Sequence, residues 1–193
     1  HTHDDHWDRA AVELIGKDKP VFVQNDSDAA LLRSQGFTHL TVMTEETAFG
    51  DIRIAKTRGG QHGTDRAYAV PELAERLGEA CGVVLRHPDE KTLYIVGDTI
   101  WRDEVAADLH KHQPDVVGLN AGYAHVIGFG PIIMGQEDVL NVHFLLPQAK
   151  IVATHMEAIN HCLLPRHALR EYVDANLIGD AVSIPEDGET VIF

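Results

Sequence analysis

The chain of 193 residues is long enough for one domain with a sizeable core, and 44% of its residues are hydrophobic against 24% charged. Its net charge of -14, with no run of Lys or Arg, argues against a nucleic-acid partner, because acidic surfaces repel phosphate backbones. No stretch approaches the roughly 20 apolar residues of a membrane helix, and two cysteines are too few for a disulfide framework. We therefore expect a cytoplasmic protein without a membrane partner.

The first part of the sequence alternates helical and strand patterns. Apolar residues from Trp7 to Ile15 at helical spacing predict a helix that stops at Gly16. Asn25, Asp26 and Ser27 can cap a second helix. Strands are predicted at 19–23, 39–43 and 50–56, and helices at 28–34 and 71–77, with a loop at 57–64.

The second part continues this alternation after a hairpin formed by residues 82–87 and 92–96. The Gly-rich segment 121–135 is predicted to be a loop. Helices are predicted at 102–112, 136–145 and 164–176, strands at 115–119 and 150–153, and short strands within 181–193. Strands that are apolar on both faces and alternate with helices predict a layered α/β fold, which we assign to one domain over residues 1–193.

The chain opens on the pattern H-x-H-x-D-H, in which His1, His3, Asp5 and His6 offer four metal-ligand side chains within six residues. In an extended segment, residues two apart point the same way, so His1 and His3 can share one ion. Imidazole and carboxylate together suit zinc, and also manganese or iron. The alternative is a tag remnant or a solvated polar end, but a tag would be a pure histidine run and would leave the two aspartates unexplained.

Three further ligand-type residues follow or end predicted strands. His62 lies in a Gly-Gly-Gln-His-Gly loop, Asp98 ends the strand in Val-Gly-Asp-Thr, and His155 ends the strand in Ala-Thr-His-Met. Loops at one rim of a layered sheet bring together residues that are distant in the sequence. Each residue alone reads equally well as a structural polar residue, but all of them in this order predict a metal site.

This ordered set resembles the metallo-β-lactamase superfamily. The segments Ile-Val-Gly-Asp-Thr, 119–122 and 154–162 resemble its bacterial Zn-dependent hydrolases related to ascorbate-6-phosphate lactonase. The resemblance implies an αββα sandwich and two divalent metal ions, zinc before manganese or iron. It also implies that His1, His3 and His62 bind the first ion, that Asp5, His6 and His155 bind the second, and that Asp98 bridges them.

Members of that superfamily carry strands before the first motif, which this sequence does not show. We therefore expect an N-terminally incomplete sandwich with an exposed edge and part of its core uncovered. Such an edge favours self-association, so a homo-oligomer is a further expectation.

The ligand set predicts a hydrolase that uses a metal-activated hydroxide on a small, anionic substrate, which is an ester, a lactone or a phosphorylated compound. Asp5 is expected to orient the nucleophile and Asp98 to hold the ion pair together. His161 reads either as a substrate contact or proton donor, or as a structural hydrogen-bonding residue at a helix start. Candidates for fixing the ligands are Asp4, Thr99 and Glu157, and His125 is a candidate pocket residue.

Two alternatives to this hydrolase remain open at the sequence level. One is a phosphodiesterase or nuclease of the same superfamily, which the negative charge and the absence of an inserted nucleic-acid-binding domain disfavour. The other is a metal-binding protein without catalysis, such as a scaffold or sensor. Metal content and turnover of generic substrates separate them.

Overall fold

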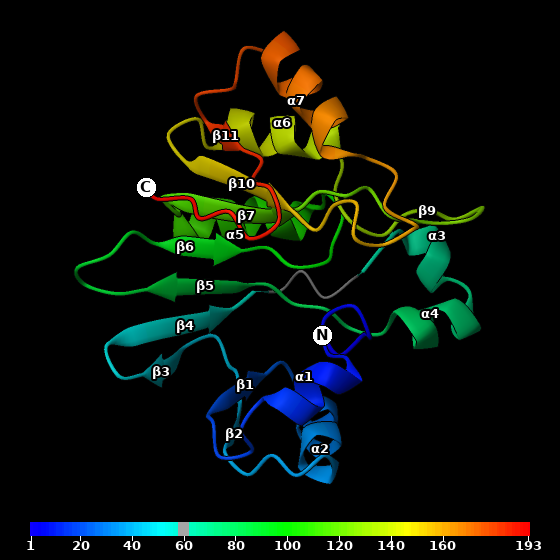
Figure 1. Ribbon diagram of the computed structural model, residues 1–193, viewed down its shortest axis with the longest axis vertical. Coiled ribbons are helices and arrows are strands. Elements are labelled where there is room, and N and C mark those ends of the chain that lie inside the picture. The colour runs from blue at the N-terminus through cyan, green and yellow to red at the C-terminus, as the bar shows by residue number, and fades with distance from the viewer. Residues whose placement is uncertain (58–61) are drawn as a thin grey trace.

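A computed structural model describes residues 1–57 and 62–193, and its centre is a seven-stranded mixed sheet (Figure 1). The sheet order is β11-β10-β7-β6-β5-β4-β3. β3 to β6 pair antiparallel, whereas β6, β7, β10 and β11 pair parallel. The strands are β3 (Thr47–Phe49), β4 (Ile52–Lys56), β5 (Val83–Arg86), β6 (Leu93–Ile95), β7 (Val116–Asn120), β10 (Lys150–Thr154) and β11 (Val182–Ser183).

Three helices, α5 (Asp103–His112), α6 (Gln136–Leu145) and α7 (Arg166–Ala175), cover one face of this sheet. Every second residue of a strand points to that face, so Val117 and Leu119 of β7 are both fully buried there. Each such side chain contributes roughly 1.5–3 kcal/mol through burial. This core fixes the ends of β6, β7 and β10, from which much of the candidate site projects.

A smaller unit lies at the β3 edge of the sheet and carries the N-terminal segment (Figure 1). Strands β1 (Val21–Val23) and β2 (Leu40–Val42) pair parallel and pack with α1 (Arg9–Leu14) and α2 (Asp26–Ser34). Asn25 is the N-cap of α2, since its side chain accepts a hydrogen bond from the backbone N–H of Asp28. Trp7, Val12 and Ile15 pack against the apolar cluster of this unit, which holds the chain that follows His6.

A third group of short elements lies beside the site: α3 (Asp65–Tyr68), α4 (Pro71–Leu77), β8 (His125–Val126) and β9 (Gly130–Pro131). β8 and β9 form an antiparallel hairpin, and its neighbours Ile132 and Ile133 pack with Ala67 and Leu77 of the two helices. Helices and hairpin thus meet in one apolar cluster.

The layered α/β fold is as predicted; two local predictions differ and two short elements were not predicted. The segment 121–135, predicted to be a loop, contains the β8–β9 hairpin, and β3 precedes the predicted strand at 50–56. α3 lies just beyond the predicted 57–64 loop, of which 58–61 fall outside the described residues. In 181–193 the structure has β11 alone. None of the described helices is long and apolar enough to cross a membrane.

Candidate metal centre

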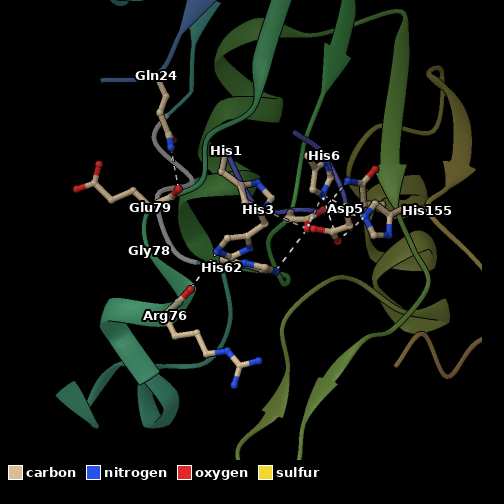
Figure 2. A network of polar contacts seen from close by, with 12 residues as sticks. His1, His3, Asp5, His6, Gln24, His62, Arg76, Gly78, Glu79 and His155 are labelled. Atoms are coloured by element: carbon tan, nitrogen blue, oxygen red, sulfur yellow. Dashed lines mark hydrogen bonds and ion pairs between the residues drawn. The ribbon is translucent and has the colours of Figure 1, made fainter. Parts of the chain in front are cut away.

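The seven predicted ligands converge at one edge of the sheet (Figure 2). The segment 1–6 lies across this edge, Asp98 follows β6, and His155 follows β10. Because β6, β7 and β10 run parallel, their carboxyl-terminal ends lie next to one another at the same end of the sheet. His62 comes from the segment before α3 and reaches the same point.

The ligand atoms fall into two groups, each within 4.8 Å: His1, His3 and His62, and then Asp5, His6, Asp98 and His155. One carboxylate oxygen of Asp98, Oδ2, joins the groups. It lies 3.7 Å from His1 Nε2, 3.4 Å from His62 Nε2 and 3.0 Å from His6 Nε2. The prediction that Asp98 bridges two ions matches this placement, and the binding itself stays a prediction.

The second group is equally compact. His155 Nε2 lies 3.1 Å from His6 Nε2 and 3.5 Å from Asp5 Oδ2, and His6 Nε2 lies 3.7 Å from Asp5 Oδ2. Two imidazole nitrogens and two carboxylates that face one another are a donor set for a divalent cation.

The buried nitrogens of this cluster fit a metal better than a hydrogen-bond network. Within the described residues, His1 Nε2 and both ring nitrogens of His62 are buried without a hydrogen-bond partner. Buried polar atoms are normally satisfied, so unsatisfied imidazole nitrogens that face a carboxylate need another partner. A divalent ion supplies it, and the residues present therefore fit a metal centre.

The protonation states also suit metal binding. Burial raises the pKa of Asp98, but hydrogen bonds from His6 and Asn120 outweigh it and hold the pKa at about 2. Burial lowers the pKa of His62 to about 4, although the charge of Asp98 opposes this. At neutral pH the carboxylate is ionised and His62 is neutral, as metal ligands must be.

Asn120 is a supporting residue to which the sequence analysis assigned no role. It is the last residue of β7, and its side-chain amide donates to Asp98 Oδ1 at 2.5 Å. Asp98 Oδ2 is thereby left to face the histidines. The sequence signal that could have identified this role is the polar Asn120 at the end of a strand that follows the Gly-Asp-Thr strand end.

The end of α4 supports the first group. His3 Nε2 lies 3.0 Å from the carbonyl oxygen of Arg76, which leaves Nδ1 of His3 available to an ion (Figure 2). The hydroxyl of Tyr68 donates to the carbonyl of Gly78 at 2.6 Å and accepts from the backbone N–H of His62 at 2.9 Å. One helix end therefore positions two candidate ligands of the first group.

We expect Tyr68→Phe to weaken binding of one ion about tenfold, because outer partners of metal ligands contribute on the order of 10–100-fold to affinity. The ring stays in place and only the hydroxyl that bonds His62 and Gly78 is lost. Competition with a chromophoric chelator measures the affinity. Tyr172→Phe is the control, since no bond of its hydroxyl is found among the described residues. Unchanged affinity in Tyr68→Phe would rule out this role.

The candidate ligand-fixing residues Asp4, Thr99 and Glu157 keep that role as a prediction. Glu157 contacts Arg166, through Nη1 at 2.5 Å and the backbone N–H at 3.1 Å, rather than a ligand ring. The hydroxyl of Thr99 donates to the carbonyl of Ile100 at 3.3 Å. Asp4 is exposed and lines a cavity beside the ligands.

That cavity measures about 780 Å³, and His161 and His125 both line it together with His62, Asp98 and His155. His161 is exposed. The structure thus brings His161 to the wall of the cavity, and its role as substrate contact or proton donor stays a prediction.

Comparison with solved structures places the fold among the metallo-hydrolases of metallo-β-lactamase type. The metallo-β-lactamase fold protein YhfI from Bacillus subtilis matches over 98% of this chain and 72% of its own, with a TM-score of 0.64 and 12% identity. Igni18, a metallo hydrolase from Ignicoccus hospitalis, matches over 99% of this chain and 76% of its own, with a TM-score of 0.71 and 21% identity. At these identities the likeness shows the fold alone.

Two other relatives are much more similar. The isothiocyanate hydrolase from Delia radicum gut bacteria is 50% identical, with a TM-score of 0.96, over 100% of this chain and 75% of its own. UPF0173 protein YddR of Bacillus subtilis is 38% identical over 100% of this chain and 74% of its own length. No family model matches the sequence. The chain belongs to the UPF0173 family, and its 50% identical homologue is named a hydrolase. The ascorbate-6-phosphate lactonase branch expected from the sequence is not confirmed.

Proposed function

We propose that this protein is a dinuclear metal-dependent hydrolase that acts on the electrophilic carbon of a small neutral substrate, with an isothiocyanate as the first candidate. The observation that carries the proposal is the convergence of two ligand groups on Asp98 at the wall of a cavity of about 780 Å³. Cavities of this size suit small molecules. The 50% identical isothiocyanate hydrolase supports the choice of substrate.

The cavity wall supports a neutral substrate over an anionic one. Three of its residues, Asp4, Asp5 and Asp98, are carboxylates, and Arg76 is the one Lys or Arg among its described residues. The bound ions would offset the charge of Asp5 and Asp98, so the choice of a neutral substrate rests on the apolar part of the wall. The opposite wall, formed by α4 and the β8–β9 hairpin, is apolar and contains Leu73, Leu77, Val126, Ile127, Phe129, Ile132 and Ile133.

The residues have distinct roles in this proposal. His1, His3 and His62 would hold one ion, Asp5, His6 and His155 the other, and Asp98 both. Bound there, divalent ions supply hydroxide at neutral pH by lowering the pKa of water to about 7, and they polarise the electrophile. Zinc is the first choice, with manganese or iron as alternatives.

Hydrolysis of an isothiocyanate joins the oxygen of water to the central carbon and breaks the carbon–nitrogen bond. The products are an amine and carbonyl sulfide, and both protons of water finish on nitrogen. Asp5, whose side chain is partly exposed beside His155, would orient the attacking oxygen. His161 at the cavity wall would donate the proton to the departing nitrogen.

The remaining parts of the proposal concern setting and partners. We place the protein in the cytoplasm, with a small molecule and no nucleic acid as its partner, and homo-oligomerisation stays part of the proposal. The phosphodiesterase alternative has less support, because the wall formed by α4 and the β8–β9 hairpin is apolar and the 50% identical relative is an isothiocyanate hydrolase.

The function is tested by assaying the zinc-loaded protein with benzyl isothiocyanate and following amine release, with bis(4-nitrophenyl) phosphate and a γ-lactone as rival substrates. We expect turnover of the isothiocyanate alone, reduced more than about a hundredfold in His3→Ala, since a ligand should matter more than an outer partner. His110→Ala, an exposed histidine on α5, is the matched control. Turnover of only the phosphodiester or the lactone would overturn the substrate assignment.

A further inference from the structure

The loop that follows β10 holds two residues in an unusual backbone conformation. His155 has φ of 58° and Glu157 has φ of 65°, and neither is glycine. Residues with a side chain adopt this left-handed region rarely, and they persist in it when the surrounding structure holds them there. His155 is a candidate ligand, so whatever holds this loop also places a ligand.

On one side the loop is held by the end of β7. A Cβ at Gly122 would overlap the carbonyl oxygen of His155, so the two segments pass at the closest approach that glycine allows. Backbone hydrogen bonds join Ala121 to Thr154 at 2.9 Å and Leu164 to Gly122 at 3.0 Å. The carbonyl side of His155 is therefore fixed against β7.

On the other side the loop is held by Glu157 and Arg166. Both carboxylate oxygens of Glu157 are engaged, Oε2 by Nη1 of Arg166 at 2.5 Å and Oε1 by its backbone N–H at 3.1 Å. Arg166 is only 8% exposed, and it also donates through Nε to the carbonyl of Pro185 at 2.9 Å and pairs with Asp187. Charge-assisted bonds of this kind are strong and directional.

We propose that Glu157 and Arg166 form a positioning pair that fixes His155, and with it the second ligand group, through the backbone of the loop. Within the described residues, the bonds of their side chains go to each other and to the C-terminal segment and not to a ligand ring; Glu157 lies two residues from His155, and Arg166 joins it to the first turn of α7. His155 Nε2 must stay close to both His6 and Asp5 for one ion to be shared. The inference rests on the proposed metal centre, and it adds Arg166 and the route through the backbone to the ligand-fixing role that the sequence suggested for Glu157.

The test measures stepwise zinc affinity by competition with a chromophoric chelator. Glu157→Gln is the main variant, because the side chain is 41% exposed and its replacement leaves the core intact. The matched control is Glu186→Gln. Glu186 lies on the C-terminal segment next to Asp187, and its carboxylate pairs at 2.7 Å with Arg170 of α7 rather than with the loop after β10. Arg166→Met serves as a second variant from the other side of the pair.

Ligand variants assign the effect to one group of ligands. In a His3→Ala background the remaining ion binds the second group, and in a His6→Ala background it binds the first. We expect Glu157→Gln to weaken zinc binding about tenfold in the first background and to leave it unchanged in the second. We expect Glu186→Gln to leave both unchanged.

Three outcomes are distinguishable. Weakening confined to the His3→Ala background, and reproduced by Arg166→Met, supports the positioning pair. Equal weakening in both backgrounds, or none, overturns it, because a general loss of stability would not select one group. A parent protein that binds no zinc would overturn the proposed function itself. If the parent binds two ions and Glu157→Gln binds them with the same affinity, only this inference is overturned.

Discussion

Asp98→Ala is expected to remove both metal ions and to lower activity by more than about a hundredfold, beyond the usual range for outer partners of a metal site. The carboxylate is 3% exposed, and one of its oxygens lies within 3.7 Å of His1, His6 and His62. Both ligand groups therefore lose the same donor, and the buried histidines then face each other without a counter-charge.

Metal content per chain measures this effect. Asp180→Ala, an exposed aspartate outside the site, is expected to keep the parent's content. A variant of Asp98 that retained about two ions per chain would show that the groups are held independently, contrary to the dinuclear arrangement.

Gly122→Ala is the substitution with the largest expected effect on stability, a loss of about 2 kcal/mol or more. The added methyl group would overlap the carbonyl of His155 and lie 2.9 Å from Cys162 Sγ. Backbone atoms cannot move aside as a flexible side chain can, so the ends of β7 and β10 must separate. The second ligand group should therefore lose its ion as well.

Urea denaturation of the metal-free protein measures the stability change, and zinc titration measures the affinity. Gly179→Ala is the control, because the nearest atom to its Cβ is 3.6 Å away, on the side chain of Asp174. We expect a change within about 0.5 kcal/mol there. Equal stability of the two variants would contradict the close approach at Gly122.

Helices whose ends are marked by glycine or proline could be predicted from the sequence. α6 (Gln136–Leu145) has the predicted bounds, and α4 (Pro71–Leu77) likewise. The hairpin of β8 and β9 could not, because its strands have two residues each and Gly128 and Gly130 among them are typical of loops. α3, with four residues, is too short to show a helical repeat.

The candidate site also contains residues that could be predicted from the sequence and residues that could not. The seven ligand-type residues are identifiable because imidazoles and carboxylates at strand ends are chemically distinctive, and the structure brings all of them together. Tyr68 and Arg166 are not identifiable from sequence, since their roles depend on contacts with segments far from the ligand motifs. The Arg76 contribution is a backbone carbonyl, which no side-chain pattern can report.

The measurement that tests the central claim most directly is anomalous X-ray diffraction from crystals of the zinc-loaded protein at the zinc absorption edge. The account predicts two peaks about 3.5–4 Å apart, one among His1, His3 and His62 and the other among Asp5, His6 and His155, with Asp98 between them. A single peak, or no peak at this edge of the sheet in protein exposed to excess zinc, would contradict it.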